Sequence, residues 1–152
     1  MEQLDIEKLS TAISGHMSFL NTNARDYLAA LHPGQNIAPI FVSELPLLYT
    51  ATFVNSVMRT LEIGNDFDLF ISLVTRSLIA TFNIPNQDAL ELAGKAAELA
   101  YASMNAPARS VENIVARAAR RHAAAIHPTD VKEEYLDVYA LIMLSIQTNG
   151  PK

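Results

Sequence analysis

The most chemically distinctive segment of the chain is residues 109–127, which hold four arginines and one glutamate. This segment has a local charge of +3 in a chain whose net charge is −5. At helical spacing, Arg117, Arg120 and Arg121 share one face, opposite a stripe of apolar residues. Guanidinium groups gathered on one face can bind phosphate, nucleic acid or an acidic helix of a partner. These three arginines are therefore our candidate partner-binding residues.

The same arginines have a second interpretation within the fold. The next predicted helix begins with four acidic residues, Asp130, Glu133, Glu134 and Asp137. An antiparallel hairpin would place these acids beside the arginines, where they would support the fold electrostatically. We therefore expect Arg120 and Arg121 to act in folding or assembly more than in nucleic-acid binding. The net negative charge also disfavours nucleic acid as a partner.

Two of these acidic residues could serve as a carboxylate pair. Glu133 and Asp137 lie four residues apart and so share a helix face. If buried, such a pair can perform acid–base chemistry. If solvated, it complements the dipole at the start of its helix, and this second interpretation is the one we favour.

The residue types needed for other kinds of site are sparse or badly spaced. The four histidines, His16, His32, His122 and His127, include no pair at i, i+4, and no glutamate precedes a histidine by three residues. The chain has no cysteine, no G-x-S-x-G motif and no two glycines close together. We therefore expect no metal site and no cofactor.

The elements that must position these residues are predicted to be helices. Hydrophobic residues make up 50% of the chain and charged residues 18%, and prolines separate segments with apolar residues at helical spacing. The sequence predicts an all-α fold, a single-domain bundle of about six helices spanning residues 1–152. An N-terminal helix covers 5–31 and the main bundle covers 43–148. The predicted N-terminal caps are Ser43, Asn65 or Asp66, Asn86, Ser110 and Asp130.

Two segments allow more than one structure. Residues 21–23 are Asn-Thr-Asn, a run of helix-capping residues that predicts a kink or a break in the first helix. In residues 45–54, Tyr49, Ala51 and Phe53 alternate with polar residues, which also permits a strand. We favour the helix because the segment is apolar almost all round, as expected for a buried central helix.

The supply of apolar helix faces predicts a homodimer. Residues 45–54, 67–82 and 136–146 are each apolar over more than one face, more than a single bundle of this size easily encloses. The first choice for the seam between subunits is the N-terminal stripe that includes Ile6, Leu9, Ile13 and Leu20. The second choice is the helix from Phe67 to Phe82.

The function that the sequence favours is a non-enzymatic helical interaction or regulatory protein, acting through self-association or a partner-binding surface. One alternative is a binder of a small apolar ligand held between buried helices. A lesser alternative is an enzyme whose site is assembled from scattered polar residues. The N-terminus lacks the features of a signal peptide, and residues 37–58 are too polar for a confident membrane span, so the expected location is cytoplasmic.

Overall fold

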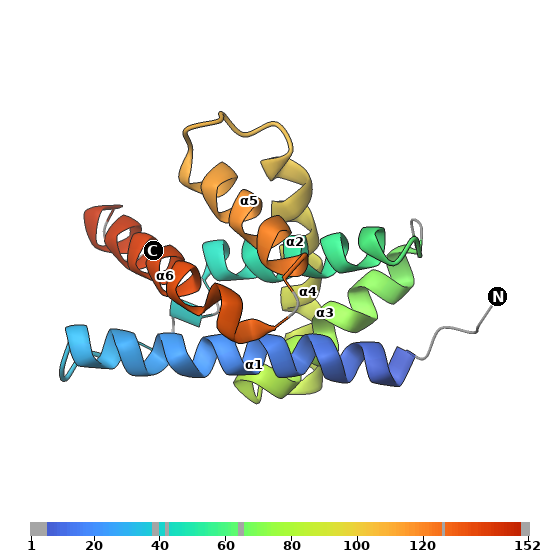
Figure 1. Ribbon diagram of the computed structural model, residues 1–152, viewed down its shortest axis with the longest axis horizontal. Helices are drawn as coiled ribbons and strands as arrows, with labels where there is room; N and C mark the ends of the chain where they lie inside the picture. The colour runs from blue at the N-terminus through green and yellow to red at the C-terminus, as the bar shows by residue number, and fades with distance from the viewer. Residues whose placement is uncertain (1–5, 38–39, 42, 64–65, 126, 150–152) are drawn as a thin grey trace.

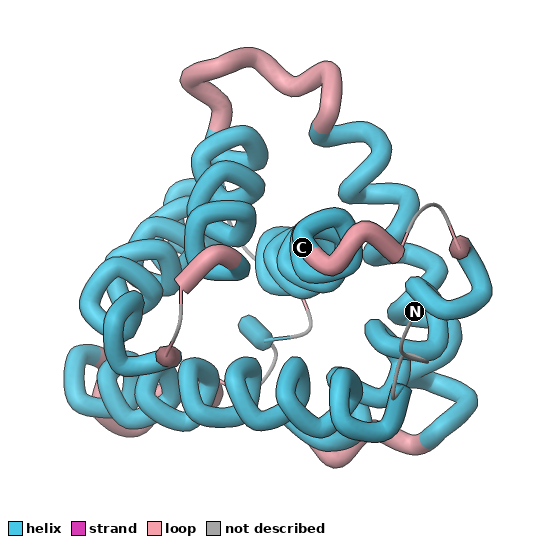
Figure 2. The backbone as a smooth tube through the Cα atoms, turned by 45° about the vertical axis from the view of Figure 1, so that its right-hand side comes forward, coloured by secondary structure: helices cyan, strands magenta, loops and turns pink. Residues whose placement is uncertain are grey.

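The computed structural model describes residues 6–37, 40–41, 43–63, 66–125 and 127–149. Across these residues the chain forms six α-helices and a short 3-10 helix, with no strand (Figure 2). In chain order the elements are α1 (Ile6–Leu31), α2 (Glu44–Thr60), α3 (Phe67–Phe82), α4 (Asn86–Ser103), α5 (Val111–Ala123), η2 (Pro128–Val131) and α6 (Lys132–Asn149). The prediction of an all-α bundle of about six helices is confirmed.

Helix α2 lies at the centre of the bundle. It packs against α3, α4 and α5, while α1 runs along one edge and contacts α3 and α6 (Figure 1). Every residue from 46 to 54 is buried, so the apolar all-round segment is the core helix and the strand alternative is wrong. Among the described residues, no helix combines the length and the apolar character needed to cross a bilayer.

The helix caps agree with the sequence prediction at two positions. The side chains of Asp66 and Ser110 accept hydrogen bonds from the backbone N–H groups of Leu69 and Asn113, three residues further along. Ser43 stands at the N-cap of α2, but its hydroxyl donates to the Ile40 carbonyl and caps no helix N–H.

The other two caps differ from the prediction. Asn86 is the first residue of α4 and follows a proline at the N-cap. Asp130 lies inside η2 and does not cap α6, because the chain first makes a 3-10 turn after His127. The predicted cap Asn65 lies outside the described residues.

Helix α1 is continuous through Asn21 and Asn23, so the expected break does not occur. Both asparagine side chains donate to a carbonyl one turn back, Asn21 to Met17 and Asn23 to Phe19, each at 2.8 Å. The Oδ1 atom of Asn21 also accepts hydrogen bonds from Tyr135 (2.9 Å) and Tyr139 (2.6 Å) of α6. These partners occupy the amide groups that would otherwise compete with the helix backbone.

The N-terminal stripe faces the core of its own chain. Ile13 and Leu20 are 3% and 0% exposed, and Leu9 is partly buried against the same core. Ile6, at the end of the helix, is 41% exposed. The stripe that we expected to form the subunit seam is therefore used in packing α1 onto α3 and α6, and it leaves little surface for a second copy.

Candidate functional site

A surface groove lies between α5 and α6, at the basic segment singled out in the sequence. Its volume is about 400 Å³, and its lining residues are Ile114, Arg117, Ala118, Arg121, Glu134, Asp137, Val138 and Leu141. The lining thus combines four apolar side chains with two cations from α5 and two anions from α6. The central feature of this site is the meeting of apolar side chains from both helices, with cations on the α5 side and anions on the α6 side.

The two helices meet here because the sequence turns sharply between them. Residues 124–131 connect α5 to α6 through the short η2 helix, which brings the acidic start of α6 beside the basic end of α5. Arg121 and Glu134 form an ion pair across the turn, as the hairpin interpretation predicted. Glu134 is the half-buried partner of this pair, with 36% of its side chain exposed.

The three candidate arginines have different positions. Arg117 and Arg121 line the groove, and the Nη2 atom of Arg117 lies 3.5 Å from the Ala108 carbonyl oxygen. Arg120 is exposed and is not among the groove's lining residues. The structure therefore brings two of the three together and leaves the third on the adjoining face of α5.

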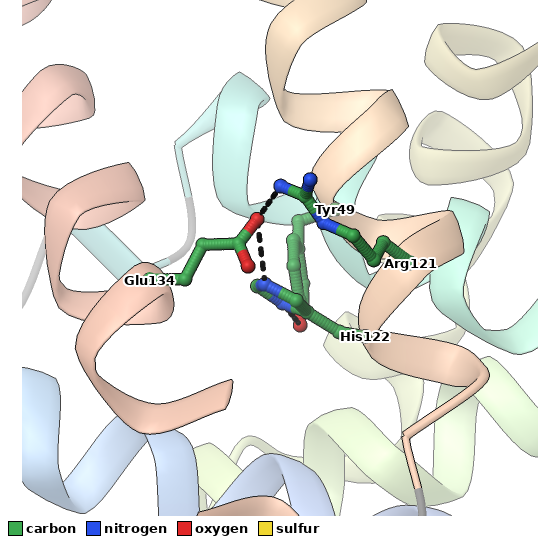
Figure 3. Close-up of polar contacts among 4 residues, drawn as sticks. All are labelled: Tyr49, Arg121, His122 and Glu134. Atoms are coloured by element: carbon green, nitrogen blue, oxygen red, sulfur yellow. Dashed lines mark hydrogen bonds and ion pairs between the residues drawn. The ribbon is translucent and has the colours of Figure 1, made fainter. Parts of the chain in front are cut away.

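A buried polar cluster lies beneath the ion pair. His122 is 0% exposed, and its Nδ1 atom lies 2.7 Å from the hydroxyl oxygen of Tyr49 on α2. Its Nε2 atom lies 3.4 Å from an Oε1 atom of Glu134. Figure 3 shows Glu134 directed toward both Arg121 and His122. The cluster links the central helix to both walls of the groove.

The protonation state of His122 follows from these contacts. Burial, together with the positive charge of Arg121 and the neighbouring His16, lowers its pKa from 6.5 to about 4. The imidazole is therefore neutral at neutral pH. In the tautomer in which the Tyr49 hydroxyl donates to Nδ1, the ring proton is on Nε2, which lies near the Glu134 carboxylate but makes no hydrogen bond to it. The charge of Arg121 balances that carboxylate, so His122 does not need to be protonated.

Family models, curated proteins and solved structures gave no match to this chain. Function is therefore inferred from the geometry of the site.

The buried cluster has the parts of a proton relay, a carboxylate, an imidazole and a phenol. However, the Tyr49 side chain is 1% exposed and His122 is 0% exposed, so a substrate cannot reach either group in this arrangement. Glu133 and Asp137 are both exposed, as expected for solvated residues at the start of a helix. Among the described residues, no three His, Asp or Glu side chains come together as a metal site requires.

Sequence reasoning did not find the buried cluster. Its two buried members on helices α2 and α5, Tyr49 and His122, each lie on an apolar helix face, where a polar side chain must find a partner. A polar residue on an apolar helix face was therefore the signal that the sequence offered. It marks the residues that need partners, but it does not say which helices supply them.

Stability is expected to depend on pH through His122 and His16. Burial also lowers the pKa of His16, whose ring stacks on Phe53 at a centroid distance of 4.6 Å, to about 4. Between about pH 4 and 6.5 the unfolded chain binds protons that the folded chain does not. The contribution of these two histidines to the free energy of unfolding is therefore fully present above pH 6.5. It is lost as the pH drops toward 4, by at most about 1.4 kcal/mol per pH unit for each histidine.

Urea titrations between pH 7 and pH 5 measure this slope. His122→Gln and His16→Gln should each reduce it, because each removes one of the two imidazoles whose pKa is lowered in the folded chain. A wild-type protein equally stable at pH 7 and pH 5 would contradict this account, because it would show that the two imidazoles bind protons in the folded chain as readily as in the unfolded chain.

Proposed function

We propose that this chain is a protein-interaction module whose α5–α6 groove binds an amphipathic helix of a partner protein. The observation that carries the proposal is the lining of the groove, in which apolar side chains of both helices lie with cations of α5 on one side and anions of α6 on the other. Helix-in-groove recognition uses this combination, with apolar anchors for affinity and flanking charges for orientation.

The charges of the groove favour a helix over the alternative occupants. A small apolar ligand would have to bury its surface beside four charged side chains, which is unfavourable without matching polar groups. Nucleic acid would bring phosphates close to Glu134 and Asp137 as well as to the arginines. A helix can carry acidic residues on the flank facing α5 and basic residues on the flank facing α6.

The buried cluster supports this function by fixing the shape of the groove. Glu134 is held by Arg121 on one side and faces His122 on the other. His122 is in turn anchored to Tyr49 on the central helix. A groove whose walls are already fixed loses little conformational entropy when a partner binds.

The proposal predicts the pattern of residues in helices that bind. A display library of helical peptides with randomised surface positions is selected against the folded chain. Selected peptides should carry apolar residues at i, i+4 and i+7, acidic residues on one flank and basic residues on the other. NMR amide shifts should then change most at the lining residues Ile114, Val138 and Leu141.

Two results would contradict the proposal. One is a selection that yields no binding helix with this pattern. The other is a set of binding helices whose NMR shift changes centre on another face, such as the exposed side of α4.

A further inference from the structure

One side of α4 carries the two most exposed large apolar side chains among the described residues. They are Tyr101 and Met104, which are 76% and 77% exposed, and Leu90 on the same side is 54% exposed. At 100° per residue, five residues fall within a band about 80° wide along the helix, here called the α4 strip: Leu90, Gly94, Ala97, Tyr101 and Met104. Their spacing alternates between four and three residues, which is the spacing of the apolar seam in a coiled coil.

The α4 strip is not part of the core of the bundle. The face of α4 that packs against the other helices contains Ala89, Ala93 and Ala96, each 0% exposed, and it lies about 90° around the helix from the strip. A Cβ atom added at Gly94, in the middle of the strip, would have no neighbour within 4 Å. The strip is therefore open to an element from outside the chain along about 21 Å, or about four helical turns.

Negative charge borders the α4 strip on its outer side. Glu91 and Glu98 are seven residues apart, so they lie on one line about 90° from the strip, on the side away from the buried alanines. Both are exposed, and neither forms an ion pair with another described residue. The basic residue of α4, Lys95, has its Nζ atom 4.0 Å from the Oε1 atom of Glu44 at the start of α2. This flank of the strip therefore has an uncompensated negative charge.

These charges distinguish between the possible occupants of the strip. An anionic membrane surface would be repelled by Glu91 and Glu98. The α4 helix of a second copy would bring the same acidic flank. The basic helix of a second copy, α5, could not supply an apolar seam, because its residues Val115 and Ala119 are 0% exposed in their own bundle. The complement that remains is a basic amphipathic helix of a different protein.

We propose that the α4 strip binds a helix of another protein that has apolar residues at alternating three- and four-residue spacing and Lys or Arg on the flank facing Glu91 and Glu98. The apolar side chains supply affinity, and the flanking charges select the partner and its register, as they do in coiled coils. The proposal is independent of the α5–α6 groove, which is formed by other helices. The groove calls for charges of opposite sign on the two flanks of its helix, whereas the strip calls for basic residues on one flank.

Two synthetic helical peptides of about 20 residues test the pairing with the full chain. Both carry leucines at the alternating spacing, and one has lysines on a single flank where the other has glutamates. Measured by isothermal titration calorimetry at low salt, the lysine peptide should bind at least about tenfold more tightly than the glutamate peptide. The difference should shrink at high salt, because these charges are exposed. NMR amide shifts should change most at Leu90, Ala97 and Tyr101.

Three sets of variants locate the binding on α4. Leu90→Ser with Tyr101→Ser should weaken binding of the lysine peptide at least about tenfold and leave the helical circular dichroism signal unchanged, since both side chains are exposed. Leu144→Ser, at a 59% exposed position on α6, is the matched apolar control and should leave the Kd unchanged. Glu91→Lys with Glu98→Lys should reverse the preference, so that the glutamate peptide binds more tightly.

Several outcomes would overturn the proposal. The first is that neither peptide binds, and the second is that the wild type binds both equally. A preference that persists in the Glu91→Lys, Glu98→Lys variant would place the binding elsewhere on the chain. A loss on Leu144→Ser as large as that of the double serine variant would show that the peptide responds to exposed apolar side chains in general.

Discussion

Asn21→Ala is expected to lower the free energy of unfolding by about 3–5 kcal/mol. The Oδ1 atom of Asn21 accepts hydrogen bonds from the hydroxyls of Tyr135 and Tyr139, which are 0% and 1% exposed. Removing the amide leaves both hydroxyls buried without this acceptor, at a cost of about 1–3 kcal/mol each. It also leaves a small cavity between α1 and α6. Urea denaturation monitored by circular dichroism measures the change.

Asn23→Ala is the matched control for this prediction. Asn23 makes the same hydrogen bond to a carbonyl one turn back, at the same distance, but it is only partly buried. Its replacement should cost less than about 1 kcal/mol. Tyr139→Phe should cost much less in the Asn21→Ala background than in the wild type, because its acceptor is already gone. Equal costs for Asn21→Ala and Asn23→Ala would show that the tyrosine hydroxyls do not depend on Asn21.

Leu20→Ala is expected to lower the free energy of unfolding by about 2–5 kcal/mol, the range for truncating a fully buried leucine. Leu20 is 0% exposed within the single chain. The loss should therefore be independent of protein concentration. At a subunit seam, by contrast, the apparent stability would fall with dilution. Thermal unfolding at several protein concentrations distinguishes the two.

Ile6→Ala provides the comparison on the same helix. Ile6 is 41% exposed, so its truncation should cost less than about 1 kcal/mol. A Leu20→Ala defect that disappears at high protein concentration would place Leu20 at a subunit interface.

The local signals in the sequence were enough to predict the helices. Asp66 and Ser110 cap helices because each precedes an apolar periodic segment, and a cap depends on only the next few residues. The prediction of a break near Asn21 was wrong because, unlike a cap, it depends on residues that are distant in the sequence. Whether an asparagine disrupts or joins a helix depends on its tertiary partners, and Asn21 finds two of them more than 100 residues away in the chain.

The candidate site was only partly predictable. The meeting of Arg121 with Glu134 follows from a short connection between two helices of opposite charge, which the sequence displays directly. The burial of Ile13 and Leu20 within one chain could not be separated from burial between two chains, because both produce the same apolar stripe. The separation of Arg117 from Arg120 depends on the angle at which α6 meets α5, which periodicity does not determine.

The most direct test of the proposed function is the affinity of one selected helical peptide for two matched variants. Arg117→Glu changes the cationic wall of the groove, whereas Arg120→Glu makes the same charge change on the same helix outside the groove. Measured by isothermal titration calorimetry, Arg117→Glu should weaken binding at least about tenfold, and Arg120→Glu should leave the Kd within about twofold. Equal losses in the two variants would show that the peptide responds to the net charge of α5, and would contradict recognition by the groove.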